Sequence, residues 1–309
     1  MRARTFPLTA LLAVRLAAAD FEIKNEAEFK KLLPQGVKLQ RLGGGMGFLE
    51  GPTWRPADQA LIFSDIPNNE LKIWTAQFGI NTLRRPSNNS NGNTIDPEGR
   101  LVTAEHSGRR VSVTLENETV ATLVDQYNGK KLNSPNDVVV RSDGTVWFTD
   151  PDYGLGQNTK EQEGNYVFRF DPKAKQNSVV SKDFDKPNGI CFSPDEKKLY
   201  VADSGKPRHI RVFQVERDGA VSNGKIFCKI DKGAPDGIRC DVDGRIWSSA
   251  GDGIQIFGAD GALIGKILAA ESPANLCFGG PEGRTLFITA RSTLYSIPTL
   301  VTGTKRPGK

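Results

Sequence analysis

Short apolar segments alternate with polar turns along this chain, and one such unit occurs six times. Each unit starts on a polar Asn, Asp or Glu, runs through a short apolar segment, turns on residues such as Asp-Gly, and continues into a second apolar segment. Successive starts are roughly 40 to 50 residues apart, which is the repeat length of a β-propeller blade. The six units start at Glu50, Asn91, Asn136, Asn188, Asp236 and Asn275.

Two further apolar segments fit between the second strand of one unit and the start of the next. The segment 37–42 precedes the first unit and has no unit of its own, so we expect it to supply the outer strand of the last blade. Such closure removes the exposed sheet edges of an open array. The sequence therefore predicts an all-β fold, a six-bladed β-propeller of four-stranded blades over 37–298 with its ring closed by an N-terminal strand. Apolar residues at helical spacing in 21–33 predict a short helix in the lead-in segment 20–36, and 299–309 form a C-terminal tail.

The first residues have the order of parts of a secretory signal. Arg2 and Arg4 precede a mostly apolar run, and alanines at 17–19 offer a small-residue cleavage site. We therefore expect 1–19 to be a signal peptide and the protein to be periplasmic or secreted. Because Arg15 interrupts the apolar run, an uncleaved N-terminus and a cytoplasmic protein are the alternative.

Composition narrows the classes of partner. The 309 residues include 41 Lys and Arg against 36 Asp and Glu, with both signs interspersed and a net charge of +5. Without a basic stripe we expect no nucleic-acid partner, and no later segment reaches the ~20 apolar residues of a membrane span. The four cysteines lack Cys-x-x-Cys spacing and do not predict a zinc site. Three of them fall on inner strands and are expected to be buried thiols: Cys191, Cys240 and Cys277.

The six unit starts carry the candidate chemistry. In a propeller the innermost strands run along the central tunnel, so their first residues meet at one mouth. Asn-Gly and Asp-Gly pairs are also ordinary turn formers, which is the simpler explanation for any one of them. Six oxygen-bearing side chains in the same phase, two of them acids, instead favour a site for a hard divalent cation such as Ca²⁺.

Several motifs resemble the gluconolactonase/regucalcin family, also called the senescence marker protein/gluconolactonase/luciferin-regenerating family. The resemblance covers about residues 37–298, and its motifs are Leu49-Glu50-Gly51-Pro52, Ser134-Pro135-Asn136-Asp137, Lys186-Pro187-Asn188-Gly189 and Pro235-Asp236-Gly237. It implies a six-bladed propeller with one divalent metal on its axis, Ca²⁺ first, with Zn²⁺, Mg²⁺ or Mn²⁺ as alternatives. The implied metal ligands are Glu50, Asn136, Asn188 and Asp236.

The resemblance also implies an activity, the hydrolysis of sugar lactones. Asp236 matches the residue that acts as general base or nucleophile in relatives, and a metal-bound water is the competing nucleophile. Asn136, Asn91 and His106 are expected to contact the substrate, although His106 at the end of a second strand also fits a structural role. Two other functions remain open: a phosphotriesterase or arylesterase on the same metal, and a calcium-binding propeller platform without turnover. A small-molecule lactone is the expected partner, and a monomer or dimer the expected assembly.

Two further groups of residues are expected to be structural. Acids that close second strands are expected to cap turns: Glu105, Asp150 and Asp203. The strand tryptophans are expected to pack between blades: Trp54, Trp147 and Trp247.

Overall fold

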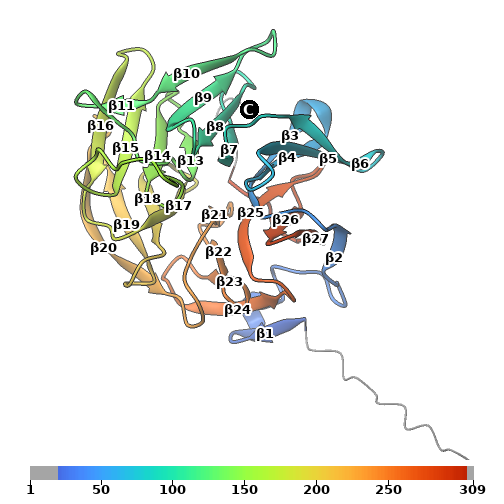
Figure 1. Cartoon of the computed structure of the whole chain (residues 1–309). Helices are drawn as coiled ribbons and strands as arrows, with labels where there is room; N and C mark the ends of the chain where they lie inside the picture. Colours follow the sequence, from blue (N-terminus) through green and yellow to red (C-terminus); the bar gives the residue numbers. More distant parts are fainter. Residues whose placement is uncertain (1–19, 305–309) are drawn as a thin grey trace, which may run out of the picture.

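Six β-sheets stand side by side around a central axis in the computed structural model, which describes residues 20–304 (Figure 1). The first blade contains β3 (Leu49–Arg55), β4 (Ala60–Asp65), β5 (Glu70–Thr75) and β6 (Gly79–Arg84). The second contains β7 (Ser90–Ile95), β8 (Leu101–Glu105), β9 (Arg110–Thr114) and β10 (Val120–Val124). The third contains β13 (Val138–Val140), β14 (Val146–Asp150), β15 (Tyr166–Asp171) and β16 (Gln176–Ser181). The fourth contains β17 (Pro187–Phe192), β18 (Lys198–Asp203), β19 (His209–Val215) and β20 (Val221–Lys229). The fifth contains β21 (Ile238–Cys240), β22 (Ile246–Ala250), β23 (Gly253–Phe257) and β24 (Leu263–Leu268).

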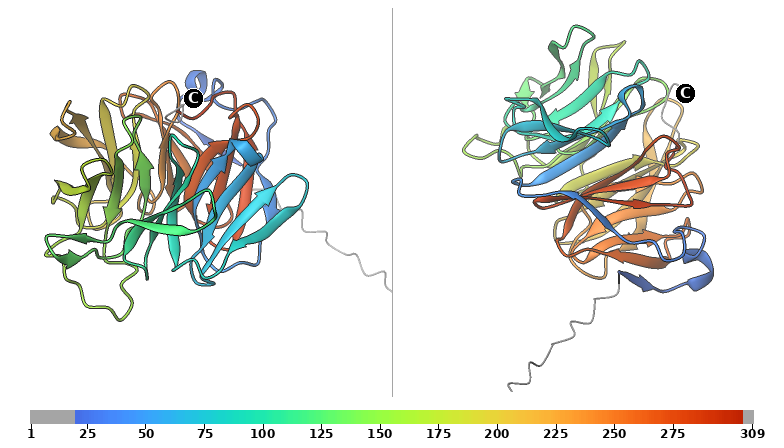
Figure 2. Two further views of the ribbon diagram at one scale, coloured as in Figure 1. Left: turned by 90° about the horizontal axis from the view of Figure 1, so that it is seen from above. Right: turned by 90° about the vertical axis from the view of Figure 1, so that its right-hand side faces the viewer.

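The sixth blade closes the ring with strands from the beginning and the end of the propeller. It contains β25 (Pro273–Gly279), β26 (Thr285–Ala290), β27 (Thr293–Pro298) and, as its outer strand, β2 (Gln40–Gly43). β2 pairs antiparallel with β27, with Gln40 opposite Ser296. The prediction of a six-bladed, four-stranded propeller closed by an N-terminal strand is therefore confirmed, and the blades stack around the axis in the two further views of Figure 2.

The lead-in segment differs from the prediction of a helix over 21–33. Phe21–Ile23 forms a strand, β1, that pairs with β24 as a fifth strand of blade five, and the helix α1 is limited to Glu26–Phe29. Asn25 begins the helix by accepting the Glu28 N–H at 3.2 Å. The apolar spacing did predict burial, because Phe29, Leu32 and Leu33 pack in one core cluster with residues of blades five and six. The predicted signal segment 1–19 lies outside the described residues.

A buried lysine fixes this lead-in segment to blade five. Lys266 Nζ lies 3.3 Å from Glu22, 2.7 Å from Asp231 and 2.9 Å from Asp252. Burial opposes the charge of Lys266, but these three carboxylates raise its pKa, so it stays protonated. The ion pairs explain why a three-residue strand stays on the edge of the sheet.

Apolar and aromatic contacts between neighbouring blades form the core. The Trp54 ring stacks on Phe287 with centroids 5.4 Å apart, joining blades one and six, and Trp147 meets Phe192 edge-on at 5.3 Å between blades three and four. Trp247 meets Phe278 at 5.3 Å between blades five and six. The prediction that these tryptophans pack the blades is confirmed.

All four cysteines are buried thiols, which confirms the prediction for Cys191, Cys240 and Cys277. Cys191, Cys240 and Cys277 line a cavity of about 130 Å³ in the tunnel, beside the described end of the C-terminal tail at Gly303 and Thr304. No helix among residues 20–304 is long and apolar enough to span a membrane.

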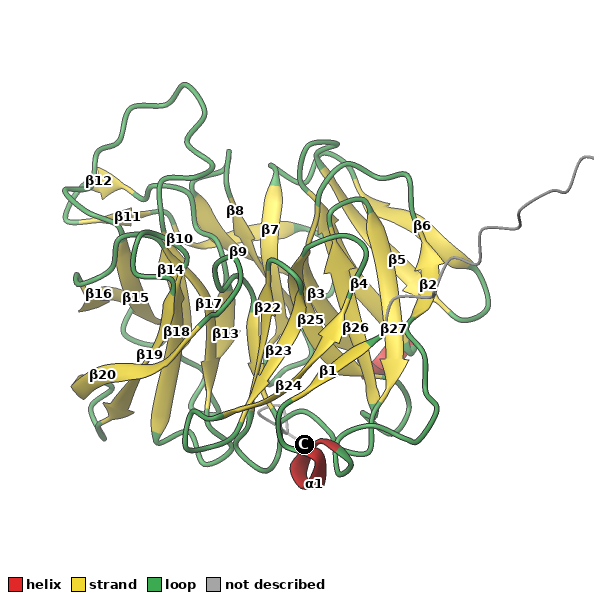
Figure 3. Cartoon of the chain, turned by 90° about the horizontal axis from the view of Figure 1, so that it is seen from below, coloured by secondary structure: helices red, strands yellow, loops and turns green. Residues whose placement is uncertain are grey.

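Two long insertions rise from one end of the propeller. One precedes β13 and contains the hairpin β11 (Gln126–Tyr127) and β12 (Lys130–Lys131); the other, 151–165, follows β14. Gln162 Nε2 donates to the carbonyls of Lys130 and Lys131 at 2.9 and 3.0 Å, which joins the two insertions. In Figure 3, β11 and β12 stand at one end of the molecule and α1 at the other. Because β13 starts and β14 ends at the same end of blade three, both insertions flank the mouth where the six units start.

Candidate active site at one mouth of the propeller

The six unit starts form one ring of residues around the axis, which we call the axial ring: Glu50, Asn91, Asn136, Asn188, Asp236 and Asn275. Hydrogen bonds between neighbouring blades connect them. The Gly92 N–H donates to the Asn136 carbonyl at 2.7 Å, and the Gly189 N–H donates to the Asp236 carbonyl at 3.1 Å. The ring therefore assembles residues that lie more than 200 positions apart, as the shared phase predicted.

The glycines that follow ring residues have a packing function. A Cβ at Gly189 would lie 2.3 Å from the Asp236 carbonyl oxygen, and one at Gly237 would lie 2.1 Å from the Asn275 side chain. These contacts are far too short for any side chain, so glycine is required where neighbouring inner strands approach. The Asn-Gly and Asp-Gly pairs of the ring thus lie at inter-blade contacts, not in the ordinary turns that each pair alone would suggest.

Glu50 is the first acid of the ring. Its side chain is buried, and Oε2 accepts the Gly51 N–H at 2.7 Å and Asn275 Nδ2 at 2.9 Å. Burial raises the pKa of Glu50 to about 7, and the negative charge of Asp137 adds to this, although the two hydrogen bonds oppose it. A nearby cation stabilises the charged form of such a carboxylate, because it offsets the free-energy cost of removing that charge from water.

Asp236 and Asn188 place unpaired oxygens in the same ring. Asp236 Oδ1 and Asn188 Oδ1 are both inaccessible to solvent and have no hydrogen-bond partner among the described residues. Burial and the charges of Glu50 and Asp137 raise the pKa of Asp236 well above its usual range, while a hydrogen bond from the Asn188 side chain lowers it. Buried acceptors without donors are rare unless something else binds them.

Asn91 is the third ring residue with an unpaired oxygen, and it explains the position of His106. Asn91 Nδ2 lies 3.0 Å from His106 Nε2, and Asn91 Oδ1 is buried without a partner among residues 20–304. An amide nitrogen can only donate, so His106 Nε2 accepts and the ring proton resides on Nδ1. Burial lowers the pKa of His106 to about 4, which keeps the imidazole neutral at pH 7. His106 thus orients Asn91; whether it also contacts a substrate stays a prediction.

The donor set fits a hard cation. It combines two carboxylates, Glu50 and Asp236, with the unpaired amide oxygen of Asn188, and the buried side chains of Asn136 and Asn91 lie in the same ring. Oxygen donors of this kind suit Ca²⁺. Among the described residues no cluster of three or more His, Cys, Asp or Glu side chains is placed to hold a metal, so any ion here depends on the asparagines.

Known proteins resemble this chain in sequence and in fold. A sequence model described as SMP-30/Gluconolactonase/LRE-like region matches residues 48–292. The chain belongs to this family. A gluconolactonase of Zymomonas mobilis is 32% identical over 88% of this chain and 84% of its own length. A pentonolactonase of Haloferax volcanii is 27% identical over 78% of this chain and 80% of its own length.

Solved structures of family members superpose closely. A gluconolactonase from Xanthomonas campestris gives a TM-score of 0.86 at 33% identity, covering 91% of this chain and 95% of its own. A regucalcin from Agrobacterium tumefaciens, described as a calcium-binding protein, gives a TM-score of 0.74 at 20% identity, covering 88% of this chain and 97% of its own. The second likeness shows the shared fold alone.

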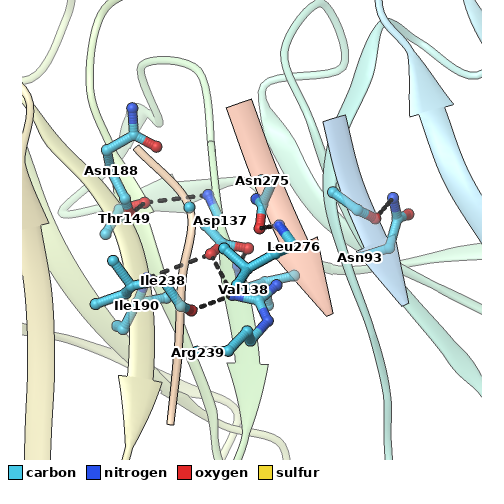
Figure 4. A network of polar contacts seen from close by, with 12 residues as sticks. Asn93, Asp137, Val138, Thr149, Asn188, Ile190, Ile238, Arg239, Asn275 and Leu276 are labelled. Atoms are coloured by element: carbon cyan, nitrogen blue, oxygen red, sulfur yellow. Dashed lines mark hydrogen bonds and ion pairs between the residues drawn. The ribbon is translucent and has the colours of Figure 1, made fainter. Parts of the chain in front are cut away.

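An ion pair inside the tunnel was not predicted from the sequence. Asp137 is fully buried, and its Oδ2 accepts from Arg239 Nη1 at 3.0 Å and from the Ile190 N–H at 3.3 Å, while Oδ1 accepts the Val138 N–H at 3.0 Å. Figure 4 shows this pair between strands of blades three, four and five. The sequence feature that could have predicted this ion pair is the arginine in the short inner strand Ile238-Arg239-Cys240, because a cation inside the tunnel needs an anionic partner.

Two of the three acids that close second strands, Asp203 and Asp150, support loops around the mouth, as predicted. Asp203 accepts the N–H groups of Asp185, Lys186 and Gly205 at 2.9, 2.9 and 3.0 Å. Asp150 Oδ2 accepts the Asn133 N–H at 2.8 Å. Glu105 departs from this pattern, because it binds side chains: the Arg110 guanidinium at 2.7 Å and the Ser112 hydroxyl at 2.6 Å.

The raised pKa values at this mouth predict how stability depends on pH. Glu50 and Asp150 have pKa values of about 7 in the fold, above their ordinary values of 4.5 and 3.8. These two carboxyl groups therefore bind more protons in the folded protein than in the unfolded chain, so their contribution to stability is lost as pH rises from about 4.5 to above 7. The lowered pKa of His106 opposes this loss only below its ordinary value of 6.5, and it opposes two acids with one group. Without metal, we expect the thermal midpoint to be several degrees lower at about pH 8 than at about pH 5.5.

Differential scanning fluorimetry with chelator, and then with saturating Ca²⁺, measures this effect. Because a protonated Glu50 is a poor ligand, the rise of the midpoint on adding Ca²⁺ should be larger at the higher pH. The Glu50→Gln variant should lose much of both effects. Equal midpoints at the two pH values in chelator would contradict the assignment of a buried, protonated Glu50.

Proposed function

We propose that this protein is a metal-dependent lactonase that opens sugar lactones at the axial ring. The observation that carries the proposal is the pairing of two acids of raised pKa, Glu50 and Asp236, with buried amide oxygens that lack partners among the described residues. The gluconolactonase and pentonolactonase relatives support lactone hydrolysis as the reaction class.

The metal in this proposal is Ca²⁺, held by Glu50, Asn136, Asn188 and Asp236. Carboxylate and amide oxygens favour Ca²⁺ over ions that seek nitrogen or sulfur, and Mg²⁺, Mn²⁺ and Zn²⁺ are the alternatives. When bound, a divalent ion supplies Lewis-acid polarisation of the lactone carbonyl, a contribution of several kcal/mol to the transition state.

The protein residues supply proton transfer and orientation. Asp236 Oδ1, which has no hydrogen-bond partner among the described residues, would accept a proton from the attacking water as the new C–O bond forms. The ring C–O bond then breaks, and the same proton passes to the departing ring oxygen, which leaves a hydroxy acid. Asn275 and the Gly51 N–H hold Glu50 in place. Asn91 Oδ1, oriented by His106, can accept a hydrogen bond from a hydroxyl of the lactone.

Hydrolysis of D-glucono-δ-lactone by the purified protein tests the proposal. We expect turnover well above the uncatalysed rate, a fall of at least about 100-fold after chelation, and recovery with a divalent ion. The substrate panel should include pentonolactones, an aryl ester and a phosphotriester. Turnover of the esters but not the lactones would favour the esterase alternative. A protein that binds Ca²⁺ and turns over none of them would favour the platform alternative.

A further inference from the structure

A third buried carboxylate, that of Asp137, lies next to the axial ring. Asp137 directly follows the ring residue Asn136 and is fully buried. Its Oδ2 accepts the Ile190 N–H at 3.3 Å, two residues after the ring residue Asn188. A Cβ at Gly92 in blade two would lie 2.7 Å from Asp137 Oδ1. The carboxylate therefore contacts the inner strands of two neighbouring blades close to where each presents its ring residue (Figure 4).

The backbone of Asp137 is fixed as firmly as its side chain. Thr149 Oγ1 accepts the Asp137 N–H at 3.1 Å and donates to the Asn188 carbonyl at 2.8 Å. The Thr149 N–H donates to the Asp137 carbonyl at 3.1 Å, and the Asn136 N–H donates to the Thr149 carbonyl at 2.8 Å. These bonds hold the Asp137 carboxylate beside the ring whatever charge the ring carries.

Arg239 brings a positive charge to this carboxylate from blade five. It lies three residues after Asp236, and its Nη1 donates to Asp137 Oδ2 at 3.0 Å and to the Ile238 carbonyl at 2.7 Å. Arginine keeps its proton in proteins, so the pair is neutral as a whole. Both ring acids are ionised when they bind a cation. Three negative charges and one positive charge then give a formal charge of −2 to these four residues: Glu50, Asp236, Asp137 and Arg239.

This formal charge matches one divalent cation. Because Asp137 is buried, water and salt screen its charge only weakly, and an ion at the ring experiences it. An Asp137 carboxylate without Arg239 would bring the formal charge to −3, and an Arg239 guanidinium without Asp137 would bring it to −1. The pair therefore decides how strongly the site attracts a cation, although neither residue belongs to the ring.

We propose that Asp137 and Arg239 together set the charge of the cation site, so that it takes a divalent ion. Both are positioning residues that act on the ion through their charges and not as its ligands. The proposal rests on the cation site of the proposed function but not on lactone turnover.

Calorimetric titration of the chelator-treated full-length protein with Ca²⁺ tests the proposal. The titration is done at about pH 9, above the pKa of about 7 of Glu50, so that fewer protons compete with the ion. Asp137→Asn keeps the size of the side chain and leaves the Arg239 charge unpaired, so it should weaken Ca²⁺ binding by about 10-fold or more. The double variant Asp137→Asn with Arg239→Met restores the formal charge of −2 and should bind within about threefold of wild type.

Arg239→Met alone gives the opposite expectation. Its formal charge is −3, so it should bind Ca²⁺ at least as tightly as wild type although its fold is less stable. Arg239 also lines the tunnel cavity of about 130 Å³, so water can solvate the unpaired guanidinium of Asp137→Asn and this variant should fold. Circular dichroism checks each variant. If Asp137→Asn does not fold, Arg239→Met and the double variant decide the question.

Asp241→Asn is the matched control. Asp241 is fully buried like Asp137, and its Oδ2 accepts from Arg245 Nη1 at 3.1 Å, but the pair lies at the other end of blade five. The same chemical change should lower the thermal midpoint there and leave the dissociation constant for Ca²⁺ as in wild type. Weakening equal to that of Asp137→Asn would mean that any lost buried ion pair disturbs the site, and it would overturn the proposal.

The other outcomes are equally decisive. Wild-type affinity in Asp137→Asn, a double variant as weak as Asp137→Asn, or weakened binding in Arg239→Met would each overturn the proposal while the proposed function stands. A wild-type protein that binds no Ca²⁺ would overturn both. If the affinities follow the predicted order and no lactone is hydrolysed, the proposed function fails and the role of the ion pair stands.

Discussion

Asp236→Ala is expected to lower kcat/KM for lactone hydrolysis by at least about 10³-fold, and excess metal should not restore it. The substitution removes a metal ligand and a proton acceptor together. Asp236 Oδ1 lies in the axial ring without a hydrogen-bond partner among the described residues, and it is placed to accept the proton of water. Loss of a ligand alone would be offset by raising the Ca²⁺ concentration, whereas loss of the proton acceptor would not. Initial rates across a Ca²⁺ titration measure the two effects separately.

Asp243→Asn is the matched control for this experiment. Asp243 lies in the turn between β21 and β22 of the same blade, is exposed, and pairs with Arg245 at 2.7 Å at the other end of the blade. It should keep wild-type kcat/KM. Full recovery of Asp236→Ala at high Ca²⁺ would contradict the role of Asp236 in proton transfer and leave it as a metal ligand alone.

Arg239→Met is expected to destabilise the fold strongly, by about 3–5 kcal/mol. It leaves the fully buried Asp137 carboxylate in the tunnel without its cation, and the N–H groups of Val138 and Ile190 cannot replace that charge. Urea unfolding in the presence of chelator measures the loss free of metal effects. Loss of the positive charge should also raise the pKa of Glu50 further, because Arg239 lowers it in the native protein.

The double variant Arg239→Met with Asp137→Asn separates charge from packing. It removes the unpaired charge while keeping a side chain of similar size, and it should recover part of the lost stability. If the double variant is no more stable than Arg239→Met, the tunnel depends on the shape of the arginine and not on its pairing with Asp137.

The repeat made most of the fold predictable. The distance from each polar start to its second strand is nearly constant, so the phase of the six units was visible even though insertions vary their spacing. The segment 37–42 could be placed by counting, since one outer strand was missing. The segment 21–33 could not, because Phe21 and Ile23 fit both a helical and an alternating pattern, and the pairing with β24 depends on the distant Lys266.

The six residues of the axial ring could be predicted from the sequence, whereas the buried ion pair beside them could not. Its six residues share a position in the repeat, so one argument placed them all. Asp137 and Arg239 occupy unequal positions in their units. Contacts between non-equivalent residues carry no periodic signal, and they became visible only when the blades were brought together.

Blade six joins the beginning and the end of the propeller, and this fixes the order in which the molecule can be completed. During synthesis the strand Gln40–Gly43 is made before the 23 other strands of the six four-stranded blades, and its partner Thr293–Pro298 is made last. The four inner strands of blade five, like those of blades one to four, come from contiguous residues, and only the sixth blade needs a distant strand to reach four. The axial ring shares this dependence, since Glu50 is held by Asn275 from that last blade. A ribosome that stops early therefore releases a protein that lacks both its closed ring and the support of its first acid.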